Sequence, residues 1–473
     1  AEAALAQAEA LAGTSLRAPA HGQMGEGWRH LGQFAAAEAA LGAALGLFGE
    51  RPSVHLAAVR NEIGFVHLGR GQYAAARAAF QAALALYEAL GDGSGTAVAL
   101  GNLGYVAQLQ SGYDAARGYL QQALTMAEEI GDRQSIVKHT LGLGWMALQQ
   151  GDMASAQRHQ AAALRLATDI GYLRGSLTAQ RHMADASLFQ NRLDDAERGY
   201  RRLLAQAQQA GLRDLAAHAI GNLGIVYARR GDYTASIQQY EAAIALCREM
   251  QDPVKVGKHL SNLGGTYLRL ERYAEARRCF DEALQINRAA GVRQTEANVL
   301  LSLGAVWRRQ GEAAQAQACF EQALAIYEAL GHKDGVGKSL GFLGLLHVQN
   351  GEYAAAVTRY EAALALSEGL ADRLTAAVWR LNLGDVYVQT GELETAAAYL
   401  HPALATLRVL NSRQYLAAGL IHEARRLLGM GQPAAARLAA EEAAALAEAV
   451  GGGERLAEAR GVLAEIGEGR CKP

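Results

Sequence analysis

Residues 260–286 read LSNLGGTYLRLERYAEARRCFDEALQI, and this stretch holds the pattern that decides the fold. Apolar side chains recur three and four positions apart before the turn at 270–272, and they do so again from Tyr273 to Ile286. This spacing is typical of amphipathic α-helices. In other parts of the chain the same turn carries a glycine, as in Gly231-Asp232, which can adopt the left-handed conformation that ends a helix. We therefore predict two helices joined by a tight turn.

The pattern returns every 40 residues, without insertion or deletion, from about residue 54 to residue 440. A small residue such as Ala276 also recurs twelve positions after each glycine of the Gly264 type. Two helices approach closely only where neither side chain intrudes, so these positions mark the crossing within each hairpin. The fold is predicted to be all-α, a right-handed solenoid of about eleven helical hairpins with terminal helices. The glycines that set the period are Gly64, Gly104, Gly144, Gly224, Gly264, Gly304, Gly344 and Gly384.

The period divides the chain into three parts. Residues 1–53 are predicted to hold an N-terminal helix and a first, irregular hairpin, residues 54–450 the regular array, and residues 451–473 a C-terminal capping helix and tail. The unit at 174–210 is the most degenerate, because it has Ala184 and Asn191 where other units have glycine. Pro402 falls inside a predicted second helix, where it should kink the chain.

Composition excludes several classes of protein. The 473 residues carry 45 basic and 47 acidic side chains, so no global charge favours nucleic acid or an acidic membrane. The four cysteines lack close pairing, which argues against a disulfide framework and fits a reducing, cytoplasmic compartment. No apolar run approaches the roughly 20 residues of a membrane helix. The first residue is Ala, which suggests a processed or excised piece of something longer.

The recurring motifs L-G-x-x-Y, G-x-Y-x-x-A and F/Y-x-x-A-L resemble the tetratricopeptide repeat over nearly the whole chain. That repeat commonly has about 34 residues, so each helix here is longer by about one turn. In their use of Ala, Leu and Gly and in their linker sequences, the repeats resemble those of the sensor arrays of bacterial multidomain signal-transduction NTPases and regulators. The resemblance implies that the first helix of every unit lines an inner face that binds protein or peptide.

Carried onto this chain, the inner-face positions contain two recurring features. An aromatic stripe is formed by Phe65, Tyr105 and Trp145, which could equally be core residues if the register is slightly displaced. A basic strip crosses the middle of the chain, although arginines near helix ends also offset the helix dipole. Lys138 and Asp185 occupy further inner-face positions. His182 lies close to Asp185 on one helix, and these two side chains are either a pair that binds a ligand or ordinary polar substitutions. The basic strip consists of Arg229, Lys258, Arg269, Arg309 and Lys338.

Four asparagines precede the Leu-Gly pair, namely Asn102, Asn222, Asn262 and Asn382. Two interpretations stay open for them: hydrogen bonding to backbone at the junction between units, or contact with a ligand. In adaptor members of the family the asparagine that most clearly holds a peptide follows the glycine, and this chain has none there. The departure weakens the reading of the groove as a peptide clamp.

The sequence lacks the signatures of common active sites, such as GxxxxGK[ST], HExxH and GxSxG with partners. We expect no catalytic residue, no cofactor and no metal. The predicted function is a non-enzymatic recognition scaffold, the sensor or interaction array of a bacterial signalling protein, whose partner is a protein or peptide with an acidic segment that matches the basic strip. The alternative is a stand-alone adaptor that joins two partner proteins through extended segments. The sequence leaves the partner's identity, the oligomeric state and the activation mechanism open.

Overall fold

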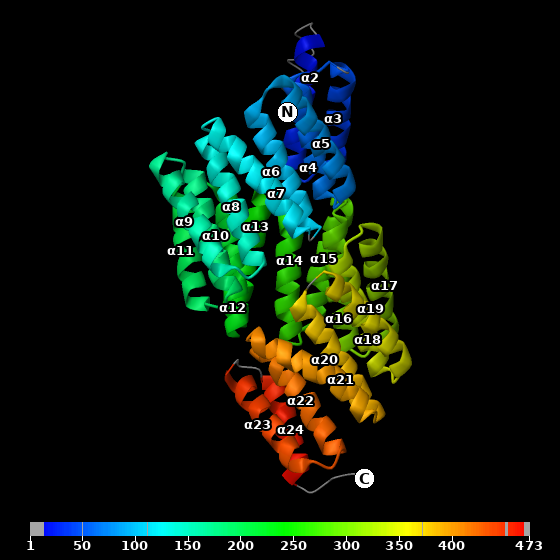
Figure 1. Cartoon of the computed structure of the whole chain (residues 1–473). Helices are drawn as coiled ribbons and strands as arrows, with labels where there is room; N and C mark the ends of the chain where they lie inside the picture. The colour runs from blue at the N-terminus through cyan, green and yellow to red at the C-terminus, as the bar shows by residue number, and fades with distance from the viewer. Residues whose placement is uncertain (1–13, 50, 111, 371, 450–452, 468–473) are drawn as a thin grey trace. The chain divides into compact units, whose positions relative to one another are not determined.

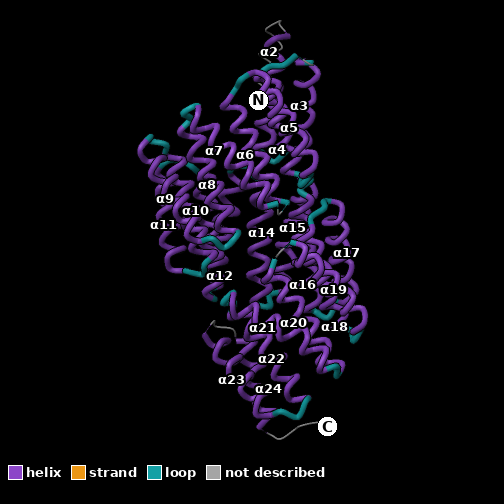
Figure 2. The backbone as a smooth tube through the Cα atoms, in the orientation of Figure 1, coloured by secondary structure: helices purple, strands orange, loops and turns teal. Residues whose placement is uncertain are grey.

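The computed structural model describes residues 14–49, 51–110, 112–370, 372–449 and 453–467. These residues form 23 helices and no strand, arranged as successive hairpins (Figures 1 and 2). The predicted all-α fold of stacked hairpins is therefore confirmed, while its right-handed sense stays a prediction. The helix predicted over residues 1–14 lies almost entirely outside the described residues, and the first hairpin, predicted over about 21–49, begins earlier, at Thr14.

The helices follow the predicted alternation of first and second helices, with short turns between them. Their bounds are α2 (Thr14–His30), α3 (Phe34–Phe48), α4 (Val54–Gly69), α5 (Tyr73–Leu90), α6 (Gly93–Leu109), α7 (Tyr113–Glu129), α8 (Arg133–Gln149), α9 (Met153–Asp169), α10 (Leu173–Phe189), α11 (Leu193–Gln209), α12 (Arg213–Arg230), α13 (Tyr233–Glu249), α14 (Pro253–Arg269), α15 (Tyr273–Ala290), α16 (Arg293–Arg309), α17 (Ala313–Ala329), α18 (Lys333–Gln349), α19 (Tyr353–Gly369), α20 (Arg373–Thr390), α21 (Leu393–Val409), α22 (Arg413–Gly429), α23 (Pro433–Ala449) and α24 (Gly453–Gly467).

The chain forms two compact units, Ala1–Val306 and Trp307–Pro473, which we describe separately. They divide inside α16, within the stretch predicted as one regular array, and the boundaries near residues 53 and 450 stay predictions. In each unit the hairpins stack on their neighbours in chain order. The last hairpin of the second unit is covered by α24, whose Ala459 and Val462 are buried against it. In the same unit α21 runs through Pro402 without interruption, and the kink expected there stays a prediction.

The repeating glycines lie where the two helices of a hairpin come closest. A Cβ atom added at Gly264 would lie 2.9 Å from the ring of Phe280, and one at Gly224 would lie 2.8 Å from the ring of Tyr240. Phe280 and Tyr240 are both buried. The absence of a side chain on one helix thus makes room for an aromatic ring from the other, as the sequence predicted for the crossing.

Glycine also ends many of the helices. Gly231 has a φ of 83° at the end of α12, and the next residue, Asp232, accepts a hydrogen bond from the Ala235 N–H at 3.0 Å, which caps α13. Between repeats, Gly91 ends α5 and Asp92 caps α6 through the Gly95 N–H at 3.0 Å. These caps satisfy backbone groups that a helix end leaves unpaired. The glycine-rich string at 91–95 is therefore an inter-repeat turn with its first helical residues.

One such turn offers a test of backbone strain. Glu271 has a φ of 57°, a region that side-chain-bearing residues adopt at a cost of about 1–2 kcal/mol. The equivalent residue two units later is Gly351, with a φ of 76°. We expect Glu271→Gly to raise the free energy of unfolding by about 1 kcal/mol, measured by urea denaturation. A loss of stability would show that the Glu271 side chain contributes more than the backbone strain costs.

The cysteines pack as small apolar residues, as expected. Cys247, Cys279 and Cys319 are buried, and none of the three forms a disulfide bond. Burial raises the pKa of the Cys247 and Cys279 thiols to about 11, so both stay protonated at neutral pH. Their position in the core favours packing over thiol chemistry.

Candidate functional site

The first helices line one side of the stack. Within the first unit, each first helix from α4 to α12 contacts the first helix of the next hairpin, whereas successive second helices of the described chain make no comparable contact. Elements on the inside of a curved stack lie closer together than elements on the outside. The face formed by α4, α6, α8, α10, α12 and α14 is therefore the inner face of this unit.

A polar cluster lies on this face and is centred on the degenerate repeat. Asp185 accepts hydrogen bonds from the Tyr200 hydroxyl at 2.6 Å and from the Asn222 amide at 3.3 Å. The Arg181 guanidinium lies 3.3 Å from the second oxygen of Asp185. We call Arg181, His182, Asp185, His218, Asn222 and Lys258 the inner cluster; they come from α10, α12 and α14.

The two histidines of the inner cluster act as acceptors for Arg181. Its guanidinium lies 2.6 Å from Nε2 of His182 and 3.4 Å from Nε2 of His218. Burial, reinforced by the charge of Arg181, lowers the pKa of each imidazole to about 3. Both rings are therefore neutral at physiological pH and can accept hydrogen bonds from the guanidinium.

Asp185 and Lys258 are both shifted toward their neutral forms. Burial raises the pKa of Asp185, although Arg181 and the bond from Tyr200 oppose the shift. The Lys258 side chain reaches solvent, yet the surrounding protein displaces much of its water, and this desolvation lowers its pKa. Its ammonium makes no hydrogen bond or ion pair within the described part of the chain. With both groups ionised, Arg181, Lys258 and Asp185 leave one net positive charge.

The three residues of the aromatic stripe lie in two separate regions of the first unit. Phe65 is half-buried, with its ring edge-on to Phe80 at 5.2 Å, and Tyr105 is 47% exposed. Both line one pocket of the first unit. Trp145 instead lies edge-on to the His182 ring at 5.7 Å, beside the inner cluster. Phe65 thus partly belongs to the core, as the alternative register implied, whereas Tyr105 presents its ring to solvent.

The model of a known repeat family matches most of the chain. The tetratricopeptide repeat matches residues 55–129, 95–169, 175–249, 256–329, 295–369 and 335–408. The chain belongs to the tetratricopeptide repeat family. A comparison with curated proteins gives no match.

Several solved structures have similar stacks of hairpins. BtubC (BKLC) from P. vanneervenii is 22% identical, with a TM-score of 0.40, and the match covers 50% of this chain and 92% of that chain. The apo form of RapI is 13% identical, with a TM-score of 0.48, over 79% of this chain and 99% of that chain. The apo form of the quorum sensor NprR from B. thuringiensis is 15% identical, with a TM-score of 0.49, over 73% and 97%.

Two asparagines of these tetratricopeptide repeats, Asn102 and Asn222, join neighbouring first helices. The Asn102 amide of α6 donates to the Asn61 side chain of α4 at 2.7 Å, and Asn222 bonds Asp185 and His218. These partners are side chains rather than backbone, and they lie at the junction between units. Asn262 and Asn382 are half-buried at the same register. Asn102 and Asn222 therefore support the stacking of repeats, and Asn222 also orients the inner cluster.

The predicted basic strip does not act as one set. Arg229 donates to the Leu188 carbonyl at 2.7 Å, in the last turn of α10, which is the helix-end role considered as the alternative. Arg269 is exposed at the end of α14, and Lys138 is exposed on α8. Arg309 and Lys338 belong to the second unit, where Lys338 is paired with Asp334 at 2.6 Å. Of the strip, Lys258 alone is in the inner cluster.

The second unit has a polar set of its own. Asp385 of α20 lies 2.7 Å from Nδ1 of His422 on α22, and Gln389 donates to its other oxygen at 2.7 Å. Burial would raise the pKa of Asp385, but His422 and Gln389 outweigh it and hold that pKa below its usual value. This carboxylate is therefore ionised: Oδ2 accepts from Gln389, whereas Oδ1 lies against the His422 ring without a hydrogen bond.

Arg181, the residue that links most of the inner cluster, was missed in the sequence. Its register carries Leu141, Gly221, Ser261, Leu301, Gly341 and Leu381 in other units. A charge at a position that is uncharged in the other units from Asn61 to Ile421 was the signal that could have identified it. Phe189 was also missed. It is an aromatic residue at the register of Arg229, and it is 52% exposed.

The described residues contain no group of three or more side chains suited to hold a metal ion. Among the same residues, no helix is long and apolar enough to cross a bilayer. The side chains of the inner cluster and Trp145 offer hydrogen bonding, ion pairing and aromatic contact.

Proposed function

We propose that the inner face of the first unit binds an extended segment of a peptide or protein, and that an acidic group of this segment pairs with Lys258 and Arg181. The chain would serve as the recognition array of a bacterial signalling protein, acting in the cytoplasm without catalysing a reaction. One observation carries the proposal. Lys258 is a desolvated ammonium on the inner face, beside a guanidinium, and it forms no ion pair within the described residues.

Three further features support an acidic peptide as the ligand. The inner cluster has a net positive charge, and because its histidines are neutral, the attraction for an anion comes from Arg181 and Lys258 alone. Arg181 and Lys258 supply donors whose charge strengthens each hydrogen bond. Trp145, which packs on His182, offers an apolar surface next to these donors. Such a combination suits a carboxylate that is flanked by an apolar side chain.

The experiment compares two lysines of the same register. Acidic and neutral peptides are pooled and their binding to the full chain is measured before and after Lys258→Gln, with Lys138→Gln as the matched control. Lys138 is exposed on α8 and lies outside the inner cluster. We expect Lys258→Gln to weaken the binding of acidic peptides by about tenfold and to reduce its dependence on salt. Equal effects of the two substitutions would refute the assignment of Lys258.

A second function, the adaptor, is favoured by one observation. The second unit carries its own polar set, Asp385 with His422 and Gln389, which could bind a basic segment of another partner. If so, Asp385→Asn in the full chain should abolish the binding of basic peptides and leave the binding of acidic peptides unchanged. Loss of both classes together, with the fold intact by circular dichroism, would contradict independent sites.

A further inference from the structure

Two parts of the first unit that are far apart in the sequence meet at a seam. Gly32, between α2 and α3, lies against Val254: a Cβ atom added at Gly32 would lie 3.2 Å from a Val254 methyl group. Phe34 and Val292 are buried in one apolar cluster, which Val254 also contacts. The Tyr73 hydroxyl donates to the Gln294 side chain, 221 residues along the chain. We define the seam as residues 32–34 and 69–73 against residues 253–254 and 292–295.

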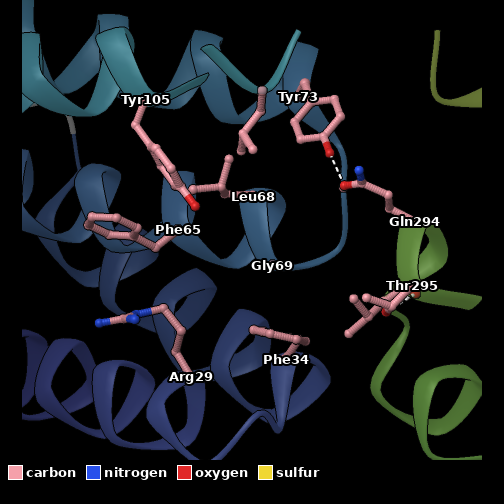
Figure 3. Close-up of a pocket in the computed structure, with 12 residues that line it drawn as sticks. Arg29, Phe34, Phe65, Leu68, Gly69, Tyr73, Tyr105, Gln294 and Thr295 are labelled. Carbon is pink, nitrogen blue, oxygen red and sulfur yellow. Dashed lines mark hydrogen bonds between the residues drawn. The ribbon is translucent and has the colours of Figure 1, made fainter. Parts of the chain in front are cut away.

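A pocket of about 340 Å³ opens at this seam. Its walls are largely aromatic and aliphatic, and they come from α2 to α6 on one side and from the start of α16 on the other (Figure 3). In Figure 3, Tyr105 and Phe65 face the space from one side, while Gln294 and Thr295 close the other. A volume of this size lies at the lower end of those that hold small ligands. It suits a single aromatic side chain.

The polar groups of the pocket favour a neutral occupant. Arg29 is paired with Glu62 at 2.6 Å, and its guanidinium lies 5.0 Å from the centre of the Phe65 ring. The charge of Arg29 is thus balanced before any ligand enters. Although the Tyr105 ring reaches solvent, the surrounding protein displaces water from both hydroxyls. This desolvation raises the pKa of Tyr73 to about 12 and that of Tyr105 in the same direction, so both hydroxyls stay protonated. They offer hydrogen bonds to an indole or phenol without attracting a charge.

We propose that the seam pocket binds one tryptophan or tyrosine side chain of the extended peptide, and that this side chain holds the two edges of the seam together. The proposal rests on the proposed function, because it assigns an aromatic anchor to the same ligand. Aromatic rings gain from offset or edge-on contact with Phe34, Phe65 and Tyr105 in addition to burial. The anchor contacts both edges at once, so it binds better to the closed seam than to an open one.

The test uses N-acetyltryptophanamide as a free probe, so it does not depend on the inner cluster or on a peptide. Saturation-transfer NMR is recorded with the native full chain, with Gln294→Trp, which fills the pocket, and with Gln134→Trp as the matched control. Gln134 occupies the register of Gln294 at the start of α8 and is exposed. We expect saturation of the probe to fall at least severalfold with Gln294→Trp and to stay at the native level with Gln134→Trp. Equal saturation with all three proteins would overturn the proposal.

A second pair of variants keeps the test decisive if Gln294→Trp does not fold. Leu109→Trp narrows the pocket from α6, and Phe189→Trp places the same ring at the equivalent position of α10, outside the pocket. The probe should lose its saturation only with Leu109→Trp. N-acetylleucinamide should give a weaker signal with the native chain, and a signal equal to that of the aromatic probe would overturn the aromatic assignment.

Hydrogen exchange reports on the seam itself. N-acetyltryptophanamide should slow exchange in residues 290–300 and 69–73 of the native chain, and Tyr73→Phe, which removes the bond to Gln294, should reduce that protection. Tyr113→Phe is the control, because Tyr113 begins α7 as Tyr73 begins α5. Protection elsewhere, with none at the seam, would contradict the proposed coupling. If Lys258→Gln leaves the binding of acidic peptides unchanged while the probe still protects the seam, the proposed role of the inner cluster is refuted and the proposed role of the pocket is supported.

Discussion

The free energy of unfolding should fall steeply as the pH is lowered from about 6.5 to about 4, because four histidines of the first unit are held neutral. Burial lowers the pKa of His139 and His259 to about 4, and that of His182 and His218 to about 3, from a usual value of 6.5. Below pH 6.5 the unfolded chain takes up these protons and the folded chain does not. Acidification therefore favours unfolding.

The packing of His139 and His259 explains why they resist protonation. They are 6% and 5% exposed, and each ring lies where a Cβ would stand if Gly101 or Gly221 had a side chain. For each of these two, the loss by pH 4 amounts to about 3 kcal/mol. Asp185 acts in the opposite sense, because burial raises its pKa and protonation relieves that cost. One carboxyl group cannot offset four imidazoles.

The measurement is urea denaturation by circular dichroism across this pH range. The double variant His139→Gln, His259→Gln should lose much of the dependence on pH, because glutamine takes up no proton. The variant His55→Gln, at an exposed histidine, should keep the native dependence. If the double variant showed the native pH dependence, other groups would have to account for it.

The second large effect concerns Gly264. A leucine there would force its first carbon to within 2.9 Å of the Phe280 ring, with further atoms to accommodate between two buried helices. Overpacking of a core commonly costs about 1–3 kcal/mol. We expect Gly264→Leu to exceed that range, because the intruding side chain separates α14 from α15, and the effect should spread to neighbouring repeats that stack on this hairpin.

The adjacent residue supplies the control. A Cβ added at Gly265 meets nothing within 4 Å, so Gly265→Leu should be neutral or should stabilise α14 by up to about 1 kcal/mol. Both variants are compared by urea denaturation of the full chain. A loss of less than about 1 kcal/mol for Gly264→Leu would mean that α15 can move away at little cost, and the close crossing would then not be essential.

The sequence predicted the local features well because each depends on residues within one 40-residue unit. The hairpin, the crossing at Gly264 and the turn at Gly231 all follow from spacing and from the needs of a helix end. The first unit's seam could not be predicted in this way. Tyr73 meets Gln294 only because the small rotation from each hairpin to the next accumulates over five repeats. The 40-residue period does not specify the size of that rotation.

The same limit applies to the candidate site. The period placed Asp185 and Lys258 on the inner face, but their common surroundings depend on how α10, α12 and α14 converge. Arg229 occupies an inner-face register and yet bonds the Leu188 carbonyl, because a long side chain reaches the nearest unpaired helix end. Register alone therefore identified the face, and the contacts between helices decide which residues act together.

The central claim is that a peptide lies on the inner face of the first unit, against the inner cluster. The most direct measurement is photo-cross-linking of the tightest-binding acidic peptide, carrying a benzophenone next to its acidic residue, to the full chain. Mass spectrometry then identifies the labelled residues. The account predicts labels on α10, α12 and α14, near Arg181 and Lys258. Labels confined to the second helices α11, α13 and α15 would contradict it.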